Sequence, residues 1–211
     1  MVIQWKLRLG VRKILRPGVL LILLLAAASL LFPLGISGSM ARASGDLDGD
    51  GRTEEYYLEN GSLSIREGTL ELWKTPEDWH IDSFVLGDAT NDKEFNLAMS
   101  LWKEGSFGKI RPFWHSGEDN SYRNHLFVYA LRDKRFQPVW CSSDLDFPIL
   151  SFDIRDADGD GRNELVTEEG RYRKPPGKRR AADLRGPVRT AVWKWEEWGF
   201  SLVEERGLPW I

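Results

Sequence analysis

Two Asp- and Gly-rich segments of the same design constrain this chain more than any other feature. The first is Asp46-Leu-Asp48-Gly-Asp50-Gly-Arg52-Thr-Glu54, and the second, 110 residues later, is Asp156-Ala-Asp158-Gly-Asp160-Gly-Arg162-Asn-Glu164. We number the nine residues of each segment as loop positions 1 to 9. Carboxylates at positions 1, 3 and 5 converge on the inner side of a tight turn, and Gly at position 6 can take the positive φ that the turn needs.

This donor set is made only of oxygen atoms. Position 7 would add a backbone carbonyl, and position 9 adds a Glu carboxylate. Ca²⁺ accepts six to eight oxygen ligands, whereas zinc and copper prefer nitrogen and sulfur. A plain Asp/Gly turn is the alternative, but acids at four matched positions in both copies favour Ca²⁺. The predicted ligands are Asp46, Asp48, Asp50, Arg52 and Glu54 in the first copy and Asp156, Asp158, Asp160, Arg162 and Glu164 in the second.

The segments do not fit an EF-hand. That motif requires Glu at position 12 and a helix on either side, but position 12 is Tyr57 in the first copy and Thr167 in the second. The residues that follow each loop are β-branched or aromatic, and residues 62–66 alternate polar with apolar at period two. We therefore expect each loop to lie between β-strands.

The two motifs resemble the FG-GAP or VCBS repeats of calcium-binding β-propellers and of many bacterial surface proteins. A degenerate third copy runs from Asp88 to Asn96, with Thr90 at position 3 and Lys93 at position 6. Whether this copy binds Ca²⁺ is left open by its sequence. The resemblance implies a β-rich unit at each loop.

Short strand-like segments recur along the chain in a way that agrees with this resemblance. We count the segments that follow each loop as one unit, which places residues 80–86 in the first unit and residues 149–154 in the second. Each unit then offers about four segments, the content of one propeller blade. The predicted fold is all-β, with about three four-stranded propeller-like blades. Three blades are fewer than the four to eight of closed propellers, which leaves a monomeric arc, a compact sandwich-like variant or an oligomeric ring. An insertion around residues 103–124 makes the spacing of the loops irregular. The segments are residues 56–58, 62–66, 70–73, 80–86, 97–102, 126–131, 138–140, 149–154, 165–167, 191–195 and 200–203.

The N-terminal residues form a targeting segment. Residues 1–43 hold six basic residues and no acidic one, and residues 19–36 are almost wholly apolar. This layout predicts a secretory signal cleaved before Ser44, or an uncleaved membrane anchor. Both alternatives place the β-repeat domain, residues 44–211, outside the cell or at its surface.

Without the targeting segment, the remaining β-repeat domain has a different net charge from the whole chain. All 32 acidic residues follow the segment, whereas six of the 29 basic residues belong to it, so residues 44–211 carry a net charge of −9. Such acidity disfavours nucleic-acid binding, which depends on neutralising phosphates, and suits cation binding.

Aromatic and basic residues suggest where a partner could bind. Trp73, Trp102, Trp140 and Trp193 occupy comparable places in apolar strands, so we expect them in the core. Trp79, Trp114, Trp195 and Trp198 are less constrained, and Trp114 lies in an accessible loop that is the first candidate for contact with a glycan or peptide. The basic stretch 171–189 contains Pro175-Pro176-Gly177, which predicts a loop or hairpin extension that is either solvated or in contact with anionic envelope polymers.

No catalytic residues are predicted. The three His residues lack metal-ligand spacing, no nucleophile elbow or phosphate loop occurs, and Cys141 is expected to be a small buried residue at a strand end. The predicted function is an exported or membrane-tethered calcium-binding β-repeat module with a binding or structural role, whose partner is a protein or glycan of the cell envelope. Membrane contact is expected only through the N-terminal segment. The alternative is a glycan-directed envelope hydrolase that uses scattered carboxylates.

Overall fold

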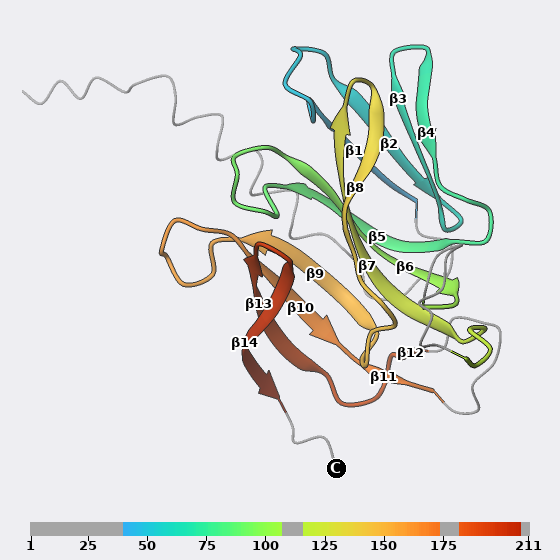
Figure 1. The fold of residues 1–211 in the computed structure, drawn as a ribbon, viewed down its shortest axis with the longest axis vertical. Helices are drawn as coiled ribbons and strands as arrows, with labels where there is room; N and C mark the ends of the chain where they lie inside the picture. The colour runs from blue at the N-terminus through green and yellow to red at the C-terminus, as the bar shows by residue number, and fades with distance from the viewer. Residues whose placement is uncertain (1–39, 107–115, 174–181, 208–211) are drawn as a thin grey trace, which may run out of the picture. The chain divides into compact units, whose positions relative to one another are not determined.

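The computed structural model of the protein describes residues 40–106, 116–173 and 182–207. The chain divides into two compact units, residues 1–37 and 38–211, and all described residues belong to the second. These residues form 14 β-strands and no helix, which confirms the all-β prediction (Figure 1). Within this described part, accordingly, there is no helix long and apolar enough to cross a membrane.

Three antiparallel sheets of four strands make up the unit, together with a small two-stranded sheet. The first sheet contains β1 (Ala41–Gly45), β2 (Glu54–Glu59), β3 (Ser62–Glu67) and β4 (Leu70–Lys74) in that order. The second contains β5 (His80–Gly87), β6 (Asn96–Glu104), β7 (Tyr122–Arg132) and β8 (Arg135–Cys141). The third has the order β14 (Gly199–Gly207), β13 (Arg189–Glu196), β10 (Glu164–Glu169) and β9 (Ile149–Arg155).

The second sheet is buried on both faces. Side chains alternate between the faces of a strand, and on β6 Leu97, Met99 and Leu101 belong to a core shared with the first sheet. Ala98 on β6 and Val128 on β7 belong to a second core, shared with the third sheet. A sheet covered on both faces needs apolar residues at successive positions rather than at alternate ones, which explains why residues 96–103 of β6 are all buried.

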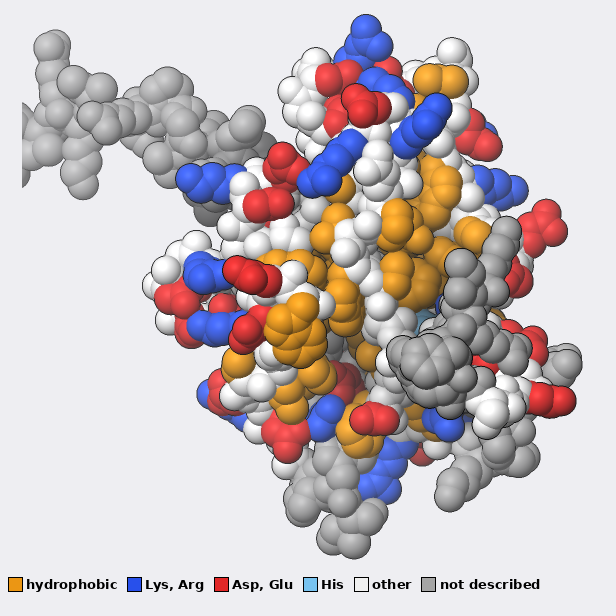
Figure 2. Space-filling view, in the orientation of Figure 1, with side chains coloured by type: hydrophobic (Ala, Val, Ile, Leu, Met, Phe, Trp, Pro, Cys, Tyr) orange, Lys and Arg blue, Asp and Glu red, His pale blue; other side chains and the backbone are white. Residues whose placement is uncertain are grey.

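The outer sheets bury only one face. On β2 and β3, Tyr56, Leu58, Leu63 and Ile65 point into the first core, and the residues between them are more exposed. In Figure 2 charged side chains cover the end of the molecule where Figure 1 places the first sheet, and hydrophobic side chains gather toward β5–β8. On β9 of the third sheet, Ser151 and Asp153 are exposed, whereas Ile149 belongs to the second core.

The structure corrects the predicted division into units. Each Asp-rich loop joins the first and second strands of a sheet, so residues 80–86 open the second sheet and residues 149–154 open the third. A strand also precedes the first loop, because Ala41, Arg42 and Ala43 pair with Leu58, Tyr57 and Tyr56. Cleavage before Ser44 would remove these three residues of β1. Residues 1–39 lie outside the described residues.

The aromatic predictions are mostly confirmed. Trp102 is fully buried, and Trp73, Trp140 and Trp193 pack against one of the two cores. Trp79 also packs in the first core, with its ring against Phe127. The candidate contact residue Trp114 lies outside the described residues.

Two further predictions concern Cys141 and the basic stretch. Cys141 is exposed, so the expectation of burial is wrong; it ends β8, an edge strand of the second sheet. The basic stretch is a hairpin extension in its described part, with β11 (Arg171–Tyr172) paired to β12 (Ala182–Asp183). Its last residue, Arg189, is not a solvated loop residue, since it is buried and binds Glu169 at 2.8 Å.

Candidate metal centre

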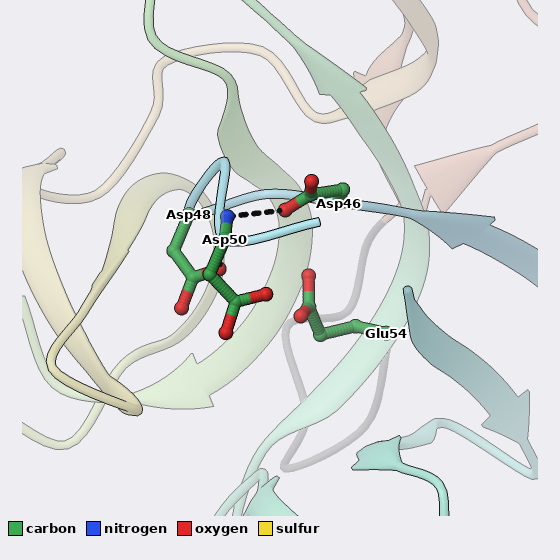
Figure 3. Close-up of side chains that lie close together, drawn as sticks. All are labelled: Asp46, Asp48, Asp50 and Glu54. Carbon is green, nitrogen blue, oxygen red and sulfur yellow. Dashed lines mark hydrogen bonds between the residues drawn. The ribbon is translucent and has the colours of Figure 1, made fainter. Parts of the chain in front are cut away.

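We number the Asp-rich loops in chain order, so that residues 46–54 are the first loop, residues 88–96 the second and residues 156–164 the third. The first loop brings four carboxylates together at the start of β2. One oxygen from each of Asp46, Asp48, Asp50 and Glu54 lies within 4.8 Å of the others (Figure 3). Three come from the turn, and Glu54 is the first residue of the strand that follows. The structure therefore gathers all four acidic residues that the motif predicted in this loop.

Backbone hydrogen bonds set the direction of these carboxylates. Asp46 accepts hydrogen bonds from the N–H groups of Asp50 at 3.1 Å and Gly51 at 2.8 Å, and Asp50 accepts one from Arg52 at 2.8 Å. Gly51 has a φ of 85°, in the left-handed region that glycine adopts without strain. Each of these two Asp residues thus uses some of its oxygen lone pairs to close the turn and retains others.

Glu54 is the most unusual member of the cluster. Its side chain is 0% exposed, and its Oε2 accepts a hydrogen bond from the Leu47 N–H at 2.8 Å. Its Oε1 is buried and accepts no hydrogen bond from any described residue. Burial, followed by the nearby Asp48 and Asp46 carboxylates, raises the pKa of Glu54. A buried carboxylate oxygen without a partner is costly, and a cation among the four acids would remove that cost.

The third loop repeats this arrangement with two differences. Oxygens of Asp156, Asp158 and Glu164 lie within 4.8 Å of one another, whereas Asp160 is outside this group. Glu164 is 1% exposed and accepts the Ala157 N–H at 2.9 Å through Oε2. Its Oε1 is buried without a hydrogen bond in the described structure, but it lies 3.5 Å from Lys194 Nζ, a contact that Glu54 does not have. The pairing of position 2 with position 9 therefore recurs in both full copies.

A lysine ammonium lies against each of the two acidic clusters. Lys134, in the β7–β8 turn, contacts Asp50 and Glu67, and its Nζ is 3.4 Å from Asp48. Lys194, on β13, lies with its Nζ 2.8 Å from Asp158 and 3.0 Å from Asp160. These contacts raise the pKa of both lysines and lower that of Asp50 and Asp160. Both clusters are thus partly neutralised by a cation of the protein itself.

The second loop makes the same turn with fewer acids. Asp88 accepts the N–H groups of Asp92 and Lys93 at 3.2 and 2.9 Å, and Asn96 Oδ1 accepts the Ala89 N–H at 3.1 Å. A neutral amide therefore performs the structural task of Glu54 and Glu164. Lys93 reaches a φ of 73° in the position that Gly fills elsewhere.

The second and third loops are joined directly. Asn91 donates its side-chain amide to the Asn163 carbonyl at 3.0 Å, and Asn163 donates its backbone N–H to Asn91 Oδ1 at 2.6 Å. A third bond runs from the Asn163 side chain to the Asp88 carbonyl at 3.0 Å. Asn91 is position 4 and Asn163 position 8 of their loops, so these bonds fix the two turns side by side.

Sequence reasoning missed the two lysines and the two asparagines. Lys134 is 84 residues from Asp50, and Asn91 is 72 residues from Asn163. No local pattern marks such residues. The hydrogen bond from the position-2 N–H to the side chain at position 9 was also missed, although the Glu or Asn that accepts it stands at position 9 in all three copies.

Arg52 and Arg162 are predicted to bind the cation through their backbone carbonyls, and this stays a prediction. What the structure adds is that the Arg52 side chain forms an ion pair with Glu67 at 3.1 Å. The pKa is shifted in the carboxyl groups of Asp50, Glu54, Glu67 and Asp160. All four belong to an Asp-rich loop or to its lysine contact.

Comparison with protein-family models and with curated proteins finds no match for this chain. The candidate site therefore rests on the geometry of its own residues.

Proposed function

We propose that this protein is an exported or membrane-tethered β-sheet module that binds Ca²⁺ in its first and third loops and has a binding or structural role at the cell envelope. Buried Glu54 carries the proposal, since its Oε1 has no described hydrogen-bond partner and its carboxylate belongs to a four-acid cluster. Oxygen-only coordination of this kind suits Ca²⁺.

The second loop separates this proposal from the plain-turn alternative. Asn96 closes its turn with a neutral amide through the same bond to position 2 that Glu54 makes in the first loop. A plain turn thus has no need of a buried negative charge at position 9. Both loops with a buried Glu there also have the full set of Asp residues at positions 1, 3 and 5, which is the pattern that a bound cation explains.

The FG-GAP or VCBS resemblance enters this proposal as an interpretation of the three sheets. Each sheet would be one repeat unit, because each has four antiparallel strands and an Asp-rich loop between its first and second strands. Bound Ca²⁺ would neutralise the clustered acids and stabilise the folded state in proportion to its excess over the dissociation constant. The N-terminal basic and apolar residues support export.

Thermal unfolding of the full-length protein tests the calcium proposal. We expect millimolar Ca²⁺ to raise the melting temperature by several degrees, and the double substitution of Asp48→Asn with Asp158→Asn to abolish this rise. The matched control is Asp92→Asn, which removes an acid from the second loop and should leave the rise intact. An unchanged melting temperature of the wild-type protein with and without Ca²⁺ would refute the proposal.

A further inference from the structure

A polar cleft of about 520 Å³ lies beside the third loop. Its lining includes Asn91 from the second loop, Asp160, Asn163 and Glu164 from the third, and Trp195 from β13. The bonds between Asn91 and Asn163 hold two of its walls in fixed positions. The cleft therefore combines a rigid polar wall, an aromatic ring and part of a candidate metal site.

The third loop is the more open of the two candidate metal sites. The side chain of Asp158 is 50% exposed, whereas that of Asp48, at the same position of the first loop, is 13% exposed. Only three acids converge in the third loop, against four in the first. A cation held by fewer protein oxygens keeps coordination positions for oxygens from solvent or from a ligand. Glu164, one of these three acids, lines the cleft together with Asp160 and with Lys194, whose Nζ is 2.8 Å from Asp158.

Trp195 gives the cleft a firm apolar surface. The residue is half-buried, and its ring meets Phe200 edge to face with centroids 5.1 Å apart. Phe200 is a buried member of the second core, so the indole is fixed from behind. An immobilised aromatic ring beside hydrogen-bonding groups is well suited to a ligand that has an apolar face and a polar edge.

The charges of the cleft indicate what kind of ligand this is. Four acidic residues, Asp160, Glu164, Glu196 and Glu197, line it together with two basic residues, Arg162 and Lys194. A divalent cation would balance this excess of negative charge, leaving carboxylates and amides that accept or donate hydrogen bonds. Such a surface repels anions when the metal is absent and suits hydroxyl groups when it is present.

We propose that this cleft binds a neutral saccharide in a Ca²⁺-dependent manner, with sugar hydroxyls completing the coordination of the third-loop cation and a sugar ring stacked on Trp195. The inference rests on the proposed calcium function and adds the ligand class to it. The first loop would then be a structural site, and the third a ligand-binding one.

The test uses full-length protein and immobilised neutral polysaccharides, namely a β-glucan, a mannan and a galactan. Each polymer is tested with chelator and with about 5 mM Ca²⁺, a concentration above the millimolar dissociation constant of a weak extracellular site. We expect retention on at least one polymer with Ca²⁺ and at least tenfold less retention with chelator. Retention that is equal in both conditions, or absent on all three polymers while calorimetry shows two bound Ca²⁺, would overturn the inference and leave the calcium proposal standing.

Matched substitutions separate the two loops. Asp158→Asn and Asp48→Asn should each remove one bound Ca²⁺, but only Asp158→Asn should abolish retention. Trp195→Ala should weaken retention about tenfold, whereas Trp198→Ala, at an exposed neighbouring residue, should not. Loss of retention in Asp48→Asn but not in Asp158→Asn would contradict the assignment. A wild-type protein that binds no Ca²⁺ would instead refute the calcium proposal itself.

Discussion

The Leu47 N–H donates to Glu54 Oε2 at 2.8 Å, while Oε1 of the same carboxylate is buried without a hydrogen bond in the described structure. Glu54→Gln can keep the first interaction through its amide oxygen and removes the charge. We expect this variant to be at least as stable as the wild type without Ca²⁺, because an unpaired buried charge costs about 1–3 kcal/mol or more. It should lose one of the two calcium sites.

Thermal unfolding with chelator and calorimetry with Ca²⁺ measure these two effects. Glu55→Gln is the control, since Glu55 is exposed on the same strand. A fall in the chelated melting temperature of Glu54→Gln, with Ca²⁺ binding unchanged, would contradict this role for Glu54.

Lys134 would compete with the proposed cation for the first loop, because its ammonium contacts both Asp48 and Asp50. Lys134→Gln should therefore raise the Ca²⁺ affinity of that loop by roughly tenfold, because the variant lacks the ammonium that repels the ion. The same variant should be less stable than the wild type in chelator. Calcium titration followed by calorimetry provides the measurement, with the exposed neighbour Arg135→Gln as the control. Equal Ca²⁺ affinities of the variant and the wild type would contradict this prediction, because they would show that displacing Lys134 costs no free energy.

Because His125 is buried, we predict that the folded protein loses stability in mild acid. The ring is 0% exposed, its Nδ1 is 3.3 Å from the Ser142 carbonyl, and its Nε2 is 3.4 Å from Asp144 Oδ1. Burial and the charge of Lys103 lower the pKa of His125, although Asp144 acts in the opposite direction. The unfolded chain therefore takes up a proton first as the pH falls below about 6.5.

The His125 contribution is present above that pH and is lost as the pH falls toward the lowered folded pKa, with a slope of at most about 1.4 kcal/mol per pH unit. Denaturant unfolding between pH 7.5 and 5.5, with chelator present, measures it; the range brackets the usual His pKa of about 6.5. His125→Gln should flatten the profile. A wild-type stability that stays constant over this range would contradict the predicted direction.

The pairing of β1 limits where the proposed export signal could be cleaved without damage to the first sheet. Ala41 and Ala43 pack against the first core, and residues 41–43 pair with β2. A chain that starts at Ser44 should melt several degrees below one that starts at Met40, because it lacks most of an outer strand. Equal melting temperatures would show that these residues add nothing, and mass spectrometry of the exported protein would identify the natural start.

The sequence predicts the strands well because their signals are local. Alternation identifies β3, and a run of apolar residues identifies β6, which is buried on both faces. Which strand begins each sheet was not predictable in the same way, because strand pairing depends on contacts between distant residues. Ala41–Gly45 was also hidden by its position at the end of an apolar segment that resembles an export signal.

The candidate metal centre was likewise predictable from the sequence only in part. Asp46, Asp48, Asp50 and Glu54 lie within nine consecutive residues, so their spacing alone predicts that they converge. Lys134 and Asn163 reach these loops from other strands and loops, and only the folded chain brings them there. The cleft beside Trp195 depends on such contacts, which is why the sequence singled out Trp114 instead as the first candidate for ligand contact.

Calorimetric titration of the full-length protein with Ca²⁺ tests the central claim most directly. We predict two bound Ca²⁺ per chain, one in the first loop and one in the third, and no binding in the variant that combines Asp48→Asn with Asp158→Asn. A wild-type protein that binds no Ca²⁺, or a double variant that still binds two, would contradict the claim.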